Sequence, residues 1–171
     1  DLGDATVKSI TAYRNLEWSD SLDLDGSPLP VALTQRDTKF HSWSQELQVT
    51  GKALDSRLNY VVGLFYYKEK AETLGPQSFF GGGASYQSDY GSHTEALAGY
   101  AQLDYNFTDA LKLTLGARYT HEEKDITRYF RINYDSANGI TAPLVVANLP
   151  YGSVPDAKYN SFSPAVTLAY Q

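Results

Sequence analysis

An acidic segment, residues 20–26, is the part of the sequence whose spacing comes nearest to a metal-binding loop, with three aspartates ending in Gly26. An EF-hand calcium loop needs oxygen ligands at positions 1, 3 and 5, glycine at position 6 and a bidentate glutamate at position 12. With Gly26 at position 6, Ser21 falls at position 1 and Ala32 at position 12, so the glutamate is missing. The segment favours a solvated turn, although the sequence does not decide whether any loop binds calcium.

Other residue types that could do chemistry do not form a catalytic pattern. Gly81 to Gly83 lack the Lys-Ser/Thr pair and following helix of a phosphate loop. His41, His93 and His121 have no acid or nucleophile at a recognisable spacing. The sequence contains no cysteine, which removes thiolate nucleophiles, thiolate metal sites and disulfides. We therefore expect no enzyme activity, no catalytic residue, no metal site and no cofactor.

Aromatic and basic side chains in the expected loops are the better candidates for function. Bulky aromatic residues on loops can stack on or enclose a ligand, and arginines can meet an anionic group. The alternative is that these residues pack the loops against one another or lie at a membrane interface. The candidates for ligand binding are Trp18, Phe79, Phe80, Tyr86, Tyr90, Arg128, Tyr129, Arg131 and Tyr134.

The segment Leu111 to Asp125 predicts the kind of element that would position these loops. Leu111, Leu113, Leu115, Ala117 and Tyr119 alternate with polar or small residues. This period of two predicts a β-strand with one apolar face. The segment runs for roughly 10 residues before its charges cluster, about the length that a tilted strand needs to cross a bilayer. Tyr119 ends the apolar face where an interfacial aromatic residue would lie.

Similar alternation predicts about six antiparallel strands in an all-β chain. The other expected strands are Ala5 to Arg14, Lys39 to Thr50, Leu58 to Tyr67, Glu95 to Phe107 and Tyr159 to Gln171. Residues 17–38, 71–93 and 126–158 are expected to be long loops, and the connections at 51–57 and 106–110 are short. Long and short connections alternate, which is typical of an up-and-down outer-membrane barrel with long extracellular loops.

The placement of charge agrees with a membrane barrel. Lys8, Glu46, Asp104, Lys112 and Arg118 all fall on the face away from lipid, and a charge on the lipid face would cost about 2–4 kcal/mol near the midplane.

No run of about 18 apolar residues predicts a transmembrane helix. The net charge of −6 argues against a nucleic-acid groove. The first residues lack the basic start and apolar segment of a signal peptide, so we expect a mature chain or an internal piece.

Several segments together resemble the barrel of TonB-dependent receptors. They are SITAYRN at Ser9 to Asn15, DLDG at Asp23 to Gly26, SQELQVTG at Ser44 to Gly51, LNYVVGLFYYKEK at Leu58 to Lys70, LTLGARYTHEEKD at Leu113 to Asp125 and SFSPAVTLAYQ at Ser161 to Gln171. The resemblance touches all the expected strands in order. Each segment alone has a loose consensus, and their joint order carries the specificity.

The resemblance implies a receptor in the outer membrane of a Gram-negative bacterium that imports a scarce nutrient, such as a ferric siderophore, with energy passed on by TonB. It implies a barrel of about 22 strands around an N-terminal plug. The chain departs from this pattern because it has no plug, no TonB-contact segment and no terminal aromatic residue. We therefore expect residues 1–171 to be part of a larger barrel domain, since about 8 strands is the smallest common barrel.

Two alternatives stay open from the sequence. A passive pore or structural barrel would share the strand pattern but would lack energised import. A soluble β-sandwich that binds a ligand would also direct its charges away from a core. The expected partners are outer-membrane lipid, TonB through a plug outside this chain and a small nutrient ligand, with no nucleic acid. The sequence does not reveal the identity of the ligand.

Overall fold

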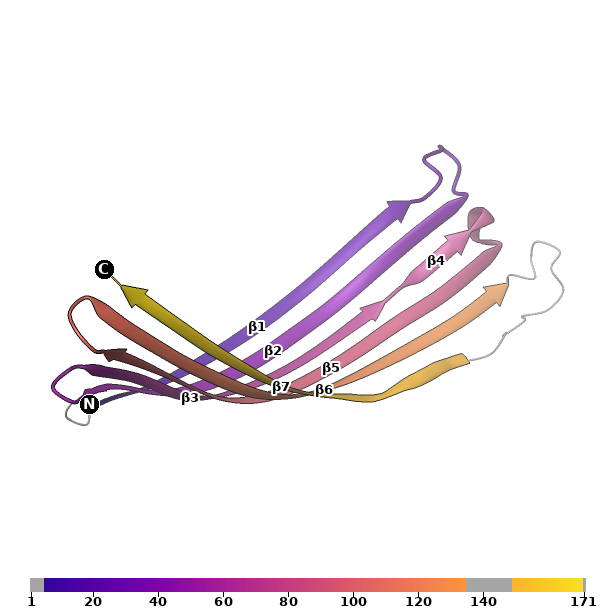
Figure 1. Ribbon diagram of the computed structural model, residues 1–171. Coiled ribbons are helices and arrows are strands. Elements are labelled where there is room, and N and C mark those ends of the chain that lie inside the picture. The colour runs from indigo at the N-terminus through magenta and orange to yellow at the C-terminus, as the bar shows by residue number, and fades with distance from the viewer. Residues whose placement is uncertain (1–4, 135–148, 171) are drawn as a thin grey trace.

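The computed structural model describes the backbone of residues 5–134 and 149–170, and the side chains of residues 5–128 and 157–170. One antiparallel sheet accounts for nearly all of this backbone (Figure 1). Its elements are β1 (Ala5–Asp23), β2 (Ala32–Ala53), β3 (Leu58–Leu74), β4 (Pro76–Phe79), the short 3₁₀ helix η1 (Phe80–Gly82), β5 (Ala84–Asn106), β6 (Leu111–Tyr134) and β7 (Leu149–Tyr170). The order across the sheet is β1-β2-β3-β5-β6-β7, which confirms the predicted meander.

The six long strands extend well beyond the predicted segments. They contain 17 to 24 residues each, so much of what the sequence predicted as loops 17–38 and 71–93 is paired strand. The third expected loop, 126–158, also contains the end of β6 and the start of β7, while its middle lies outside the described residues. These loop predictions were wrong because the apolar alternation stops where the wall no longer contacts lipid, while the backbone hydrogen bonds continue.

The short strand β4 continues the line of β3 after an interruption at Gly75. Leu74 pairs with Asp37, and Gln77, three residues later, pairs with Thr34, so the register across β2 does not change. The Ser88 N–H donates to the Gly75 carbonyl over 3.0 Å. A Cβ at Gly75 would lie 2.4 Å from the Ser88 carbonyl oxygen, which explains why a residue without a side chain occupies this position.

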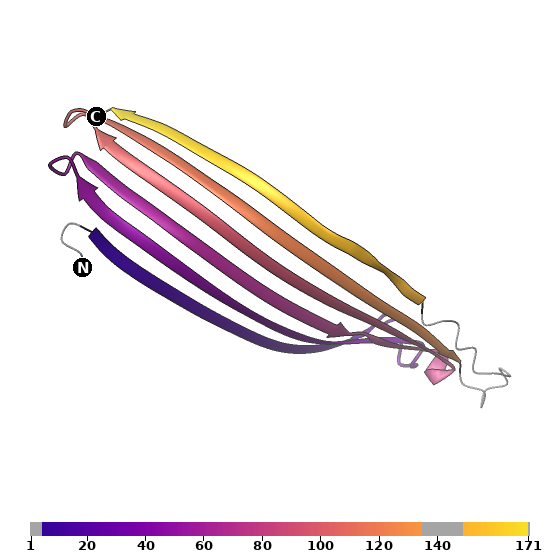
Figure 2. The same cartoon turned by 90° about the horizontal axis from the view of Figure 1, so that it is seen from below.

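The sheet is curved (Figures 1 and 2). Its two faces differ in how tightly their side chains are packed. The buried side chains are Ser42, Ala84, Ser88, Ala96 and Ala98. The pairing register places all five on one face. Side chains crowd together on the concave side of a bent sheet, so we call this the inner face. It corresponds to the interior of a barrel.

The outer face carries a continuous apolar band. Leu115 lies between Leu103 and Val166, and Val62 lies between Val49 and Ala101 in the rows of paired residues. The band consists of exposed hydrophobic side chains, including Val62, Leu64, Leu103, Leu115 and Val166. Aromatic residues border it: Tyr66 and Trp43 at one end, with ring centroids 5.7 Å apart, and Tyr60 and Tyr105 at the other. This is the aromatic-girdled surface that a bilayer requires.

Charged residues follow the predicted division between the faces. Lys8, Glu46, Asp104, Lys112 and Arg118 all lie on the inner face by register. The polar outer-face residue Gln45 is accommodated by hydrogen bonds, since Thr11 Oγ1 donates to its Oε1 over 2.5 Å and its Nε2 donates to Ser9 Oγ over 2.9 Å. A polar group whose hydrogen bonds are satisfied within the wall can face lipid at low cost.

The connections divide between the two ends of the sheet. The turns between β2 and β3 and between β5 and β6 lie at one end, with Ala5 and Tyr170, while the β1–β2 loop and η1 lie at the other (Figures 1 and 2). We refer to these as the short-turn end and the long-connection end. No helix among the described residues has the length and apolar character needed to cross a membrane.

Candidate functional site

A row of paired residues crosses the inner face near the long-connection end. In order from β1 to β6 it contains Trp18, Thr38, Thr73, Tyr90 and Arg128. The row lies beyond the apolar band, so it faces the mouth of the barrel rather than its membrane-embedded part. The sequence placed its members in three separate loops, and the sheet register brings them into one line.

Trp18 and Arg36 form one side of this row. The Arg36 guanidinium carbon lies 5.4 Å from the centroid of the Trp18 ring. Asp20 holds the guanidinium in place, since it accepts hydrogen bonds from Nη2 over 2.8 Å and from Nε over 3.2 Å. These hydrogen bonds raise the pKa of Arg36. The result is a fixed cation above an indole ring, an arrangement that suits a planar or anionic group.

Tyr90 and Arg128 form the other side. The Arg128 guanidinium carbon lies 5.2 Å from the Tyr90 ring centroid. The buried Ser88 hydroxyl lies 3.0 Å from the Tyr90 hydroxyl and donates to it, which fixes the ring from below. A hollow of about 360 Å³ opens beside Thr73, Tyr90 and Arg128. This second arginine–aromatic pair mirrors the first across the sheet.

Small hydroxyl residues separate the two pairs. Thr38 and Thr73 lie side by side with their hydroxyl oxygens 3.0 Å apart. Three strand-to-strand steps of about 4.8 Å separate Trp18 from Tyr90, or roughly 14 Å. We call the whole set, Trp18, Arg36, Thr38, Thr73, Tyr90 and Arg128, the arginine–aromatic row. Its two cations and two rings flank a floor that can donate and accept hydrogen bonds, over a width that fits a small molecule.

The predicted site residues fall into three groups. Five of them share the inner face: Trp18, Phe79, Tyr86, Tyr90 and Arg128. Phe79 and Tyr86 form an edge-to-face pair with ring centroids 5.2 Å apart. Phe80 lies in η1 and is 75% exposed. The backbones of Tyr129, Arg131 and Tyr134 extend β6, and their side chains lie outside the described residues.

Sequence reasoning missed Arg36, Arg14 and Phe40. Arg36 lies in a predicted loop, and only the pairing of β2 with β1 sets it opposite Asp20 and beside Trp18. The Arg14 guanidinium carbon lies 5.6 Å from the Phe40 ring centroid, so a third arginine–aromatic pair lies nearer the membrane. Residues with no apolar alternation give no facing signal, and a register fixed by the neighbouring strands is needed to place them.

A polar cluster lies deeper on the inner face. The Tyr100 hydroxyl donates to Glu46 Oε1 over 2.5 Å, and Gln48 Nε2 donates to the Tyr100 hydroxyl over 2.8 Å. The Tyr100 ring covers Gly63, where a Cβ would lie only 2.3 Å from the ring carbon Cζ. Arg118 lies over this ring, with its guanidinium carbon 6.0 Å from the centroid. This network stiffens the wall that supports the arginine–aromatic row.

The acidic loop uses its carboxylates to hold its own backbone. Asp25 Oδ2 accepts from the Ala32 N–H over 2.8 Å, and its Oδ1 accepts from the Ser27 N–H over 2.9 Å. Asp23 Oδ1 accepts from the Asp25 and Gly26 N–H groups. In the part of the chain that the structure describes, no group of three or more metal-binding side chains comes together. Turn formation accounts for these aspartates.

Two of the histidines do have acidic neighbours, which the sequence spacing did not reveal. His93 Nε2 and His121 Nε2 each lie 3.2 Å from a glutamate oxygen, of Glu95 and Glu123 respectively. Residues two apart on a strand share a face, so these contacts are local. Both pairs lie on the outer face, away from the arginine–aromatic row.

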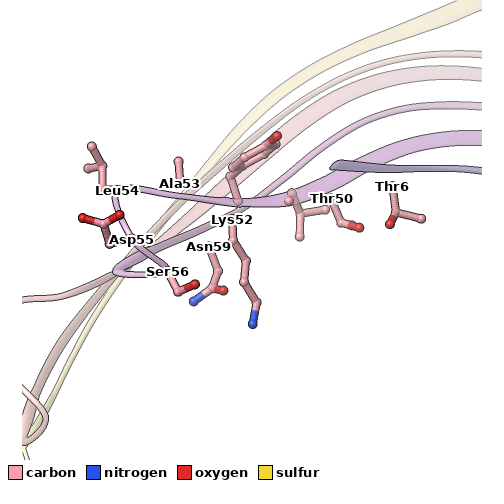
Figure 3. Close-up of a pocket in the computed structure, with 11 residues that line it drawn as sticks. Thr6, Thr50, Lys52, Ala53, Leu54, Asp55, Ser56 and Asn59 are labelled. Atoms are coloured by element: carbon pink, nitrogen blue, oxygen red, sulfur yellow. The ribbon is translucent and has the colours of Figure 1, made fainter. Parts of the chain in front are cut away.

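A second hollow, of about 740 Å³, lies at the opposite end of the wall (Figure 3). The β2–β3 turn forms it, with three consecutive residues, Leu54, Asp55 and Ser56, at positive φ. Its lining includes Thr6, Thr50, Lys52 and Asn59. This hollow contains no ring stacked with a cation, and it lies at the short-turn end, far from the arginine–aromatic row.

Comparison with known proteins identifies the family. The model of the TonB dependent receptor-like β-barrel matches residues 1–171, the full length of the chain. The chain belongs to the TonB-dependent receptor family. Barrels of TonB-dependent receptors lie in the outer membrane of Gram-negative bacteria, and the apolar band with its aromatic borders is the surface that this location requires. Among curated proteins, no match to the sequence is found.

A solved uptake receptor contains a segment with the same fold. The crystal structure of the ferric yersiniabactin uptake receptor FyuA from Yersinia pestis superposes with a TM-score of 0.69 at 17% sequence identity. The match covers 98% of this chain and 23% of FyuA, so the chain spans about a quarter of that receptor's length. The single curved sheet thus corresponds to part of a barrel wall, and the described residues do not form the two packed sheets of a β-sandwich.

Proposed function

We propose that this chain is a barrel segment of a TonB-energised importer, and that its arginine–aromatic row contacts an anionic ferric chelate of the siderophore type. The observation that carries the proposal is the pairing of two cations with two rings, Arg36 on Trp18 and Arg128 on Tyr90, across a threonine floor. Guanidinium groups meet carboxylate, catecholate or hydroxamate oxygens, while the rings stack on planar ligand groups.

The place of the row supports this function. It lies on the inner face beyond the membrane band, where a ligand arriving from outside meets the barrel wall first. The match to FyuA, a ferric yersiniabactin uptake receptor, supports a ligand of the same broad class. The proposal includes a plug domain elsewhere in the receptor, through which TonB supplies energy, and outer-membrane lipid around the barrel. It assigns transport and no catalysis to the chain.

Substitutions in the full receptor test the row directly. Arg128→Ala removes one guanidinium, and Trp18→Ala removes one ring while leaving the Arg36–Asp20 ion pair in place. We expect each variant to bind the cognate ferric chelate about tenfold more weakly, since a hydrogen bond to a charged group contributes about 1.5–3 kcal/mol and a ring contact about 0.5–1.5 kcal/mol. Arg57→Ala, in the β2–β3 turn, is the matched control and should bind normally. Titration of purified receptor measures the three affinities, and unchanged binding by both row variants would refute the site.

Uptake by cells separates an energised receptor from a passive pore. Cells that carry the receptor but lack TonB should bind iron-labelled chelate at the surface without accumulating it. Accumulation at the same rate with and without TonB would show a pore instead. This measurement does not depend on which residues contact the ligand, so it tests import independently of the row.

A further inference from the structure

Two connections at the long-connection end are fixed to each other by backbone hydrogen bonds. The Phe80 N–H donates to the Val31 carbonyl over 2.8 Å, and the Gly81 N–H donates to the Pro30 carbonyl over the same distance. The β1–β2 loop and η1 therefore form one structural unit rather than two independent loops. Figure 1 shows both beyond the ends of the strands.

The β1–β2 loop displays a leucine on a stiff backbone. Leu29 is 65% exposed and lies between Pro28 and Pro30, each of which fixes its own φ. Asp25 accepts two backbone N–H groups of the same loop, as described above, and the Leu29 N–H donates to Ser27 Oγ over 3.2 Å. The segment thus presents a large apolar side chain on a backbone that loses little entropy when a partner binds.

Phe80 is displayed at a conformational cost. Its φ is +54°, a left-handed value that is unfavourable for a bulky residue, and its ring is 75% exposed. The two glycines that follow, Gly81 and Gly82, also have positive φ, and both have open space where a Cβ would lie. Among the described residues, little burial of the Phe80 ring offsets the strain in its backbone. Strain of this kind is concentrated at functional sites.

The exposed apolar side chains of this unit are continuous with the arginine–aromatic row. We call Leu24, Leu29, Val31 and Phe80 the apolar tip, and all four are exposed. Phe80 follows Phe79, whose ring packs edge-to-face on Tyr86. Along β5 the inner face carries Tyr86, then Ser88, then Tyr90, so the Phe79–Tyr86 pair lies between the apolar tip and the Tyr90–Arg128 pair. Aromatic groups therefore lead from the outermost connections toward one side of the arginine–aromatic row.

We propose that the apolar tip holds an apolar arm of the ligand, so that the substrate class is an amphiphilic anionic chelate carrying an acyl or similar hydrocarbon chain. The inference rests on the proposed function, because it assumes that the anionic end of the ligand meets the arginine–aromatic row. It adds a second contact surface and a chemical feature of the ligand that the row alone does not specify.

The proposal is tested by measuring how tightly the full receptor binds two synthetic ferric tris-catecholates. The two compounds differ only in one acyl group, which is acetyl in one and decanoyl in the other. We expect the decanoyl form to bind about tenfold or more tightly than the acetyl form, because burial of each methylene contributes to affinity. The double variant Leu29→Ser with Phe80→Ser should lose this preference and bind both forms as the acetyl form binds. Leu54→Ser, at an equally exposed leucine of the short-turn end, is the control and should keep the preference.

A second variant distinguishes loss of the Phe80 ring from a folding defect. Phe80→Gly removes the ring while placing at φ +54° the residue that tolerates it best, so it should fold normally and still reduce the preference for the decanoyl form.

Cysteines introduced as Leu29→Cys and Phe80→Cys should react with a membrane-impermeant maleimide on intact cells and be protected by the decanoyl chelate. Unreactive cysteines would show that other loops of the receptor cover the tip, which overturns the proposal.

The outcomes distinguish the two proposals. Equal binding of both chelates, unaffected by the tip variants but weakened by Trp18→Ala, overturns the amphiphilic ligand and retains the arginine–aromatic row. Failure of both chelates to bind, or binding that is unchanged by Trp18→Ala and Arg128→Ala, refutes the proposed function itself. A decanoyl preference that depends on the tip residues supports both.

Discussion

Single residues on the inner face show how closely the wall is fitted. The Tyr100 ring lies across Gly63, and its hydroxyl is hydrogen-bonded to Glu46 and Gln48. The positions of these three side chains therefore depend on the absence of a side chain at Gly63. Gly99, in the neighbouring row but on the outer face, has no such role, because a Cβ there would meet Leu64 Cδ2 at an ordinary 3.6 Å. The two glycines, on adjacent rows, therefore differ in whether a methyl group could be added without displacing a neighbouring side chain.

The substitution Gly63→Ala tests this difference. The new methyl group must displace the Tyr100 ring and break its hydrogen bonds, so we expect a loss of about 1–3 kcal/mol in the free energy of unfolding. Gly99→Ala should change stability little. Urea unfolding of the receptor in detergent, followed by tryptophan fluorescence, compares the two variants, and equal midpoints would contradict the packing argument.

The β1–β2 loop should respond to acid through Asp25. Hydrogen bonds, first from Ser27, lower the pKa of the Asp25 carboxyl below its ordinary 3.8. A depressed folded pKa gives a contribution to loop order that is present above the ordinary value and is lost as the pH falls through the folded value. We expect the Ala32 amide to lose protection from hydrogen exchange, corrected for intrinsic rates, below pH 3.8. Asp25→Asn should show no such step.

At the scale of strands, adjacent residues on one strand meet different environments. Val61 and Val62 are consecutive in β3, with Val62 on the outer face in the apolar band and Val61 on the inner face opposite Gln102. The same substitution at these two positions therefore compares a charge that faces lipid with one that faces the interior, because the residue type and the strand are shared.

We expect Val62→Arg to destabilise the folded barrel by about 2–4 kcal/mol, because it places a charge in lipid near the middle of the band. Val61→Arg should be tolerated far better, since its side chain enters the polar interior. The fraction of heat-modifiable, folded receptor in outer membranes is the measurement. Comparable losses for both variants would mean that the faces have been assigned incorrectly.

At the scale of the whole molecule, the wall has two unfinished edges. Within the described residues β1 pairs only with β2, and β7 pairs only with β6. Lipid does not tolerate unpaired backbone groups, and open sheet edges promote association between chains. The fold is therefore stable as part of a closed barrel and not as a separate sheet.

A protein consisting of residues 1–171 alone should consequently fail to insert into detergent micelles or vesicles as a monomer. We expect oligomers or aggregates joined through β1 and β7, detected by light scattering and by the absence of a heat-modifiable band. The complete receptor provides the control. A monodisperse, folded monomer of this segment would contradict the edge argument.

The sequence by itself determined the membrane-spanning part of the fold. Lipid on one side and a polar interior on the other impose a period of two, and residues such as Leu111, Leu113 and Leu115 display that period directly. The strand order, the facing of Lys8 and Arg118 and the aromatic borders all follow from it. The joint order of the strand segments was enough to indicate the family, which the family comparison confirmed.

Only the tertiary structure determined the strands and their pairing beyond the membrane-spanning part. There the strands continue without an apolar face, so residues 17–38 and 71–93 show no alternation and were predicted as loops. Cross-strand pairing sets Arg36 over Trp18 and Arg128 over Tyr90, and it joins η1 to the β1–β2 loop. Backbone N–H and C=O groups form hydrogen bonds whatever the side chain is. The register of this region is therefore fixed by the neighbouring strands, and it leaves no periodic signal in the sequence.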